Sequence, residues 1–159
     1  MKLKNIGKIG KKNLMTLQKI RREILKEAKP HVIKNGWNDA LFIKISKTSE
    51  YKINEIKALF PNGYKSILQM YMNEINEKMT NDSKKIQLIR YRVHERIREL
   101  IILRLKIMFE EKKLISKTFL YLLLPNNYKF STYNLYKTVD EIWFLAGDNS
   151  TDFNFYSKR

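Results

Sequence analysis

Few side chains of this sequence could take part in acid–base or metal chemistry. The two histidines, His31 and His94, fall in segments with helical periodicity, and neither has a second metal ligand one turn further along. Glu95 and Glu99 are spaced one helical turn apart among three arginines, a pattern typical of ion pairs along a helix. The chain has no cysteine, glycine-rich phosphate loop, nucleophile elbow or Glu-x-x-His pair. We therefore predict a protein that is not an enzyme and has no metal site or cofactor.

The end of the chain differs in amino-acid composition from the rest. The stretch IWFLAGDNSTDFNFYSKR (142–159) interleaves aromatic side chains with small, acidic and hydroxyl residues, whereas lysine, isoleucine and leucine dominate elsewhere. Gly147 can take the left-handed position that ends a helix. A simple turn explains neither the aromatic residues nor Asp152. Exposed aromatic side chains next to an acid make a poor core and good anchors for a partner, so this stretch is a candidate interface.

Composition favours one all-helical chain with a strong positive charge. The 159 residues include only five glycines and three prolines, too few turn residues for the hairpins of an all-β protein. The net charge is +16, with eleven basic and two acidic residues in the first 35 positions. This charge favours an anionic partner, either nucleic acid or an acidic membrane surface. The abundance of lysine, isoleucine and asparagine is also typical of AT-rich genomes.

Apolar periodicity predicts a basic flexible tail at 1–13, a helix-turn-helix-like three-helix unit at 14–61 and a helical domain at 62–159. Pro30 should kink or split the first helix, which ends near Gly36. Asn38 is a candidate N-cap for the next helix, with Ala40, Leu41, Ile43 and Ile45 inward, and Ser131 for the last. The expected helices are 14–36, 38–46, 51–60, 63–79, 84–110, 113–124 and 131–146.

The three-helix unit has the outline of a DNA-binding domain. Two short helices follow a longer one, and LFPNGYKSIL (59–68) is similar to the passage that opens the fourth helix of TetR-type regulators, whose second short helix enters the DNA major groove. Tyr51, Lys52 and Lys57 could contact DNA. Glu50 and Glu55 would face phosphates, which makes DNA an unlikely partner. A TetR-type transcriptional regulator is therefore our alternative function.

A second resemblance covers the chain from about Ile24 to its last residue. The segment VDEIWFLAGDNSTDFNFYSKR (139–159) matches many residues of one known protein family at the same spacing. The segments ILKEAKPHVIKNGWNDALF (24–42), ALFPNGYKSIL (58–68), VHERIRELIILRLKIM (93–108) and LLLPNNY (122–128) agree in order. Together they resemble the TetR-like lipid-binding accessory proteins of coenzyme Q (ubiquinone) biosynthesis, which assist the demethoxyubiquinone hydroxylase.

This resemblance implies a function without catalysis. The helix-turn-helix is kept, the helical domain binds an isoprenoid or quinone-precursor lipid, and a surface patch docks the hydroxylase. By position, the patch would consist of Ile142, Asp152, Phe155 and Tyr156. For the lipid we expect an apolar lining, although the same spacing also fits a plain core. The expected lining residues are Leu100, Leu103, Ile107, Phe119, Leu120, Leu123 and Trp143.

The resemblance also has a limit. The family continues past the Lys-Arg pair at 158–159 with dimer-forming and membrane-binding helices, so we expect a helical domain that lacks its last helices, and a homodimer is left open. The longest apolar run, FLYLLL (119–124), is far shorter than the roughly 18–20 residues that span a bilayer. The lysine-rich start is neither a secretory signal nor typical of a transit peptide. We expect a cytoplasmic, bacterial-type protein, peripheral on the inner face of an anionic membrane.

Overall fold

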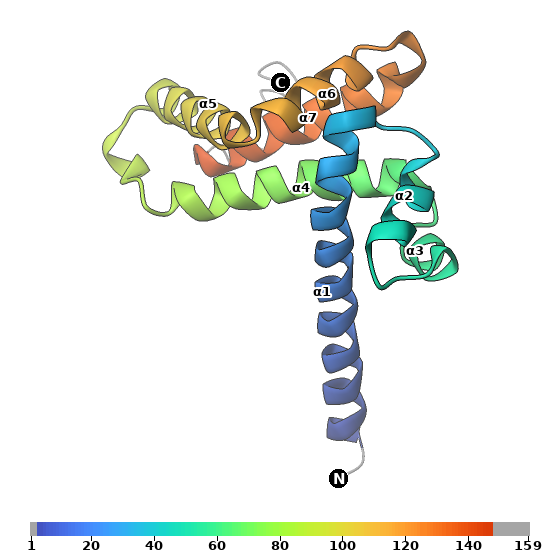
Figure 1. Ribbon diagram of the computed structural model, residues 1–159. Helices are drawn as coiled ribbons and strands as arrows, with labels where there is room; N and C mark the ends of the chain where they lie inside the picture. The colour runs from blue at the N-terminus through green and yellow to red at the C-terminus, as the bar shows by residue number, and fades with distance from the viewer. Residues whose placement is uncertain (1–2, 148–159) are drawn as a thin grey trace. The chain divides into compact units, whose positions relative to one another are not determined.

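The computed structural model describes the backbone of residues 3–147 and the side chains of residues 16–147, and every regular element in this part is helical (Figure 1). The all-α fold class is thus confirmed. The chain divides into two compact units, residues 1–68 and 69–159, so the division falls seven residues after the boundary expected at 61/62.

The first unit is built from α1 (Leu3–Asn35), α2 (Leu41–Thr48) and α3 (Ile53–Leu59). Four residues in the second half of α1 are fully buried, and they follow the spacing of one helix face. These residues are Ile24, Leu25, Ala28 and Val32. The rings of Phe42 and Phe60 meet edge to face with centroids 6.5 Å apart, and the Arg21 guanidinium lies 5.1 Å from the Phe60 centroid. Aromatic packing therefore joins the three helices.

Helix α1 differs from its prediction at both points where we expected irregular structure. It begins at Leu3, so the backbone of 3–13 is helical, and it runs through Pro30 without a break. A proline removes one backbone hydrogen bond, and the buried Ala28 and Val32 hold the helix on either side of it. The end near Gly36 is confirmed, since this glycine has φ +71° and donates to Val32 O at 2.7 Å.

Helix α2 starts close to the predicted residue, but the residues on its buried face differ from those predicted. The Asn38 side chain accepts the N–H of Ala40 at 3.1 Å, and the helix begins at Leu41. Leu41, Phe42 and Ile45 are buried, whereas Ala40 is exposed and Ile43 is 49% exposed. The inward prediction for Ala40 and Ile43 was therefore wrong, because an eight-residue helix buries only one narrow face.

The second unit contains most of α4 (Tyr64–Ser83), the short 3₁₀ turn η1 (Leu88–Arg90), α5 (Val93–Glu110), α6 (Lys112–Leu122), the turn η2 (Pro125–Asn127) and α7 (Tyr128–Leu145). Helices α5, α6 and α7 pack against one another. Its fully buried side chains include Tyr71 and Met79 of α4, Leu100 of α5 and Leu114 of α6.

The single long helix predicted for 84–110 was wrong. Helix α4 continues to Ser83, and α5 starts only at Val93. The Glu95 carboxylate accepts the N–H of Arg92 at 2.8 Å, which caps the start of α5. Arg96 Nε donates to Tyr91 O at 2.7 Å, so a side chain binds the backbone of the preceding loop. These polar contacts end a pattern that apolar periodicity alone would continue.

Ser131 is not the N-cap of the last helix, because α7 already begins at Tyr128. Its hydroxyl donates instead to Leu122 O at 2.6 Å, and the Asn127 amide donates to Tyr121 O at 2.8 Å. Both bonds satisfy carbonyl groups at the end of α6, which have no partner within a helix. The turn between α6 and α7 is thus closed by side chains.

Gly147 ends α7 in the expected left-handed conformation, with φ +90°. Its N–H donates a hydrogen bond to Phe144 O at 3.0 Å. Arg96 Nη1 donates to the neighbouring Ala146 O at 3.1 Å. A Cβ atom on Gly147 would lie 3.1 Å from the same Arg96 nitrogen. The end of α7 and the start of α5 are therefore joined at a point with little spare room.

We predict that Gly147→Ala lowers the free energy of unfolding by about 1–2 kcal/mol, because alanine is strained at this φ and displaces the Arg96 side chain. Urea unfolding followed by circular dichroism measures the loss. Gly36→Ala is the control, since its φ is +71° with nothing within 4 Å of the added Cβ. An equal loss in both variants would show that the contact with Arg96 has no energetic effect.

Candidate functional site

The predicted lipid-facing residues of α5 and α7 point into the second unit. Leu100 and Ile107 are buried, and Leu103 and Trp143 are half-buried. Leu100 and Ile107 are two turns apart on one face of α5. These four residues belong to the interior of the unit.

The predicted residues of α6 lie on its opposite face. The inward face of α6 carries Leu114, Ile115, Thr118 and Tyr121, all buried. Phe119 and Leu120 are 48% and 62% exposed, and Leu123 and Leu124, just beyond the last residue of the helix, are 78% and 52% exposed. We call these four exposed residues the α6 strip. The seven predicted lining residues are therefore divided between the interior and the α6 strip.

The predicted docking residues are only partly described. Ile142 lies on α7 and is buried, with 7% of its surface exposed. Asp152, Phe155 and Tyr156 lie outside the described residues. The docking patch thus stays a prediction.

A row of polar side chains connects α4 with α7. Gln69 Nε2 donates to Asn134 Oδ1 at 2.8 Å, and the Thr80 hydroxyl donates to the Glu141 carboxylate at 2.8 Å. Lys137 Nζ donates to Asn73 Oδ1 at 3.1 Å. We call this row the polar seam. Its members are Gln69, Asn73, Asn76 and Thr80 of α4 and Asn134, Lys137, Thr138 and Glu141 of α7.

Arg104 of α5 extends into the polar seam. Its guanidinium donates to the Asn76 amide oxygen and, at 3.1 Å, to the Thr138 hydroxyl. Only 8% of the residue is exposed, and burial lowers the pKa of Arg104 to about 10. The sequence reading missed this residue, although it stands one turn from both Leu100 and Ile107. A cation within an apolar stripe was the signal that could have revealed it.

Tyr71 is a second buried ionisable group of the second unit. Burial, and then the negative charge of Glu111, raise the pKa of its phenol well above the ordinary value. Glu111 immediately precedes α6. The phenol is thus held in its neutral form.

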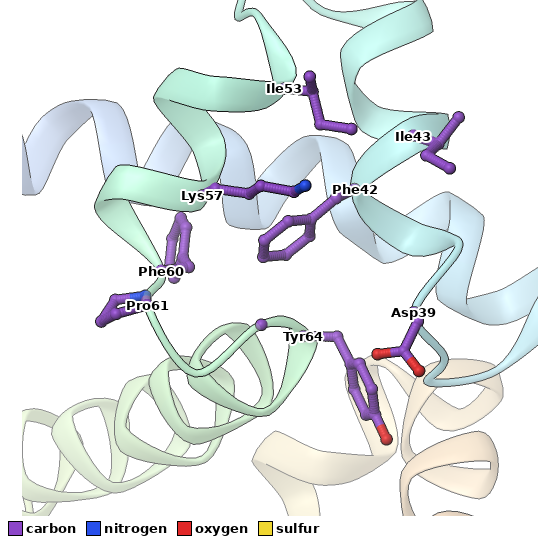
Figure 2. A pocket seen from close by; sticks show the side chains of 9 residues that line it. Asp39, Phe42, Ile43, Ile53, Lys57, Phe60, Pro61 and Tyr64 are labelled. Carbon is purple, nitrogen blue, oxygen red and sulfur yellow. The ribbon is translucent and has the colours of Figure 1, made fainter.

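The first unit has an apolar hollow of about 400 Å³ between α2, α3 and the start of α4 (Figure 2). Its volume suits a small molecule or an aromatic side chain of a partner. Figure 2 shows the Lys57 side chain reaching towards Phe42, with Asp39 and Tyr64 on the other side. None of the predicted lipid-lining residues belongs to it. The hollow is lined by Asp39, Phe42, Ile43, Ile53, Lys57, Phe60, Pro61, Gly63 and Tyr64.

The candidate DNA-contacting residues are partly engaged within the first unit. The Tyr51 hydroxyl donates to the Glu23 carboxylate at 2.5 Å, and Glu55 accepts the backbone N–H of Lys52 at 2.9 Å. Lys52 and Lys57 are exposed. The helix that would read DNA, α3, has seven residues.

The two histidines lie on α1 and α5. His31 is hydrogen-bonded to the Thr48 hydroxyl at 2.9 Å. Within the described residues, no group of three or more His, Cys, Asp or Glu side chains could hold a metal ion. In the same part of the chain, no helix is long and apolar enough to cross a membrane.

Comparison with known proteins connects α7 to a family. Residues 128–159, which comprise α7 and all predicted docking residues, match the COQ9 family model. The chain is also similar to the ubiquinone biosynthesis protein COQ9, mitochondrial, of Bos taurus, with 26% identity over 149 residues. The chain is therefore similar to COQ9 proteins. The same protein of Homo sapiens is 25% identical over 149 residues, which confirms the resemblance read from the sequence.

The similarity covers most of this COQ9-like chain and less of its relatives. Both alignments take in 89% of the chain but 46% of the relative, so the chain spans about half the length of the curated relatives it matches. The relatives carry mitochondrial names, whereas we expected a bacterial-type cytoplasmic protein. The family model itself matches only the C-terminal 32 residues, 128–159.

We predict that stability falls above pH 10 in part through Tyr71. The unfolded chain loses the phenolic proton near pH 10 while the folded chain keeps it, so the free energy of unfolding decreases as pH rises, by up to about 1.4 kcal/mol per pH unit for this group. Urea unfolding at pH 9.5–11 should show a shallower decline for Tyr71→Phe. The exposed Tyr133→Phe is the control, and equal slopes in both variants would contradict the assignment.

Proposed function

We propose that this COQ9-like chain takes part in ubiquinone biosynthesis as a non-catalytic accessory protein. In this proposal it binds an isoprenoid or quinone-precursor lipid and presents it to the demethoxyubiquinone hydroxylase. The names of the relatives support the pathway, and the match over 128–159 supports a role for the C-terminal stretch. The lipid and the hydroxylase come from the family resemblance, and the arrangement of the second unit supports them.

The α6 strip carries the lipid part of the proposal. Helix α6 is apolar on both sides, since Leu114, Ile115 and Tyr121 are buried on one side and the strip is exposed on the other. Apolar side chains that gather on an exposed surface often mark an interaction site. An apolar chain lying on the strip would gain about 0.8 kcal/mol for each CH₂ group removed from water. A long isoprenoid tail is suited to such a surface.

Several polar groups that could act in catalysis are engaged in structure instead. Glu55 and Glu95 accept N–H groups at the starts of α3 and α5, and His31 binds Thr48. Burial and the charge of Glu111 keep the Tyr71 phenol neutral. These engagements support an accessory role rather than an active site.

The positive charge supports an association with an anionic membrane surface. The chain carries +16, and exposed basic side chains on the described part of α1 include Lys19, Arg22 and Lys26. Each basic residue near an anionic bilayer contributes about 1 kcal/mol to binding. A peripheral position would bring the protein close to a membrane-dissolved lipid.

Organic extraction and mass spectrometry of the purified protein test the lipid proposal. We expect an isoprenoid or quinone-like lipid at near-stoichiometric yield, and about tenfold less from the double variant Leu120→Ser, Leu123→Ser, because two apolar contacts are lost. Ile89→Ser is the control, since Ile89 is 85% exposed but lies on η1. Absence of lipid from the well-folded wild-type protein would refute lipid binding.

Co-purification with the hydroxylase tests the docking proposal. Phe155→Glu and Tyr156→Glu should each abolish recovery of the complex, because a charge replaces an aromatic anchor of the interface. Tyr133→Glu, at an exposed position of α7, serves as the control for added negative charge and should leave recovery unchanged. Undiminished recovery with both C-terminal variants would exclude this patch as the docking surface.

A further inference from the structure

The hollow of the first unit is a cavity to which the proposed lipid function gives no role. Its volume of about 400 Å³ is at the lower end of the range for small-molecule sites, roughly 300–1,000 Å³. It contains none of the residues assigned to the lipid or to the hydroxylase. A cavity of this size suits a compact ligand rather than a long isoprenoid tail.

The walls of the hollow are held in place by packing within the first unit. The rings of Phe42 and Phe60 meet edge to face with their centroids 6.5 Å apart, and the Arg21 guanidinium lies 5.1 Å from the Phe60 centroid. In the turn before α4, Gly63 has φ +63° and its N–H donates to Phe60 O at 3.0 Å. The cavity is therefore formed before a ligand binds, which lowers the entropic cost of binding.

Part of the apolar lining is accessible from outside. Ile43 is 49% exposed, and Pro61 is also exposed. A Cβ atom placed on Gly63 would meet nothing within 4 Å, so there is room beside the backbone of this turn. A ligand with an apolar body would cover these surfaces and remove them from water.

One cation and one carboxylate line the hollow on opposite sides. Figure 2 shows Lys57 of α3 reaching towards Phe42, and Asp39, shortly before α2, on the other side. Both residues are exposed, and within the described part of the chain neither side chain has a hydrogen bond or an ion pair. Two opposite charges across an apolar cavity favour a ligand that has a carboxylate at one end and an ammonium group at the other.

We propose that the hollow binds a small zwitterion whose two charges lie at opposite ends of an apolar body. In this site Lys57 pairs with the carboxylate of the ligand and Asp39 with its ammonium group, while Phe42 and Ile43 contact the apolar body. All of these residues belong to the first unit. The inference therefore goes beyond the proposed lipid function and does not depend on it.

A ligand with one charge suits the site less well. An anion paired with Lys57 would turn its apolar end towards the carboxylate of Asp39, and a cation paired with Asp39 would turn its apolar end towards Lys57. In both cases one charged group gains no partner. Binding that requires both signs also differs from the general attraction of anions to a chain with a charge of +16.

Isothermal titration calorimetry with the full chain tests the inference with four probes of nearly the same shape. The zwitterion is 4-(aminomethyl)benzoate, the singly charged probes are 4-methylbenzoate and 4-methylbenzylamine, and the neutral probe is 4-methylbenzyl alcohol. We expect the zwitterion to bind roughly tenfold more tightly than either singly charged probe, because each of these lacks one charge-assisted hydrogen bond.

Two substitutions of exposed residues assign each charge to its end of the ligand. Lys57→Met should weaken binding of the zwitterion roughly tenfold but should not weaken binding of 4-methylbenzylamine, which has no carboxylate. Asp39→Asn should weaken binding of the zwitterion in the same way but should not weaken binding of 4-methylbenzoate. The controls Lys47→Met and Glu50→Gln change exposed charges outside the hollow and should leave all four affinities unchanged.

Three results would overturn this inference. Absence of zwitterion binding at concentrations up to about 10 mM would exclude the site. Equal affinities for the neutral alcohol and the zwitterion would show that the hollow accepts any apolar group, such as an aromatic side chain of a partner protein. An equal loss in Lys47→Met and Lys57→Met would assign the preference to the overall charge of +16.

Discussion

The burial of a guanidinium among neutral partners is the constraint on which the second unit depends. Arg104 reaches Asn76 of α4 and Thr138 of α7, so one side chain of α5 is bonded to two other helices. Since a buried donor without a partner costs about 1–3 kcal/mol, these bonds limit how far the helices can slide past one another. The apolar residues of α5 provide the packing energy, and the polar seam determines the register at which that packing occurs.

The backbone polar groups at several helix ends are also hydrogen-bonded by side chains. Glu95 and Arg96 bind the backbone around the start of α5, and Arg96 also bonds to Ala146 at the end of α7. Ser131 and Asn127 bind carbonyl groups at the end of α6. Side-chain hydrogen bonds therefore help to fix several turns of this glycine-poor and proline-poor chain, in addition to the left-handed Gly36 and Gly147.

Apolar periodicity predicted the number and order of the main helices, because each buries one stripe. It failed where side chains bind backbone, as at Arg92, since the apolar spacing of 84–110 continues through the break. It also missed Arg104, Asn134 and Thr138, because a pattern of apolar residues treats polar ones as exposed. Those polar groups are buried only because they meet across helices distant in sequence. The apolar interior of the second unit was thus partly predictable from the sequence, and its buried polar groups were not.

Charge and apolar surface come together on α6, which explains why this helix departs from an ordinary core helix. It begins with exposed Lys112 and Lys113, and cations at a helix N-terminus oppose the helix dipole. Their position therefore does not serve helix stability. The same helix ends in the exposed α6 strip, so basic and apolar surfaces follow one another along about three turns. Basic side chains beside apolar ones are typical of helices that meet anionic lipid, which agrees with the proposal that the protein takes a lipid from a membrane.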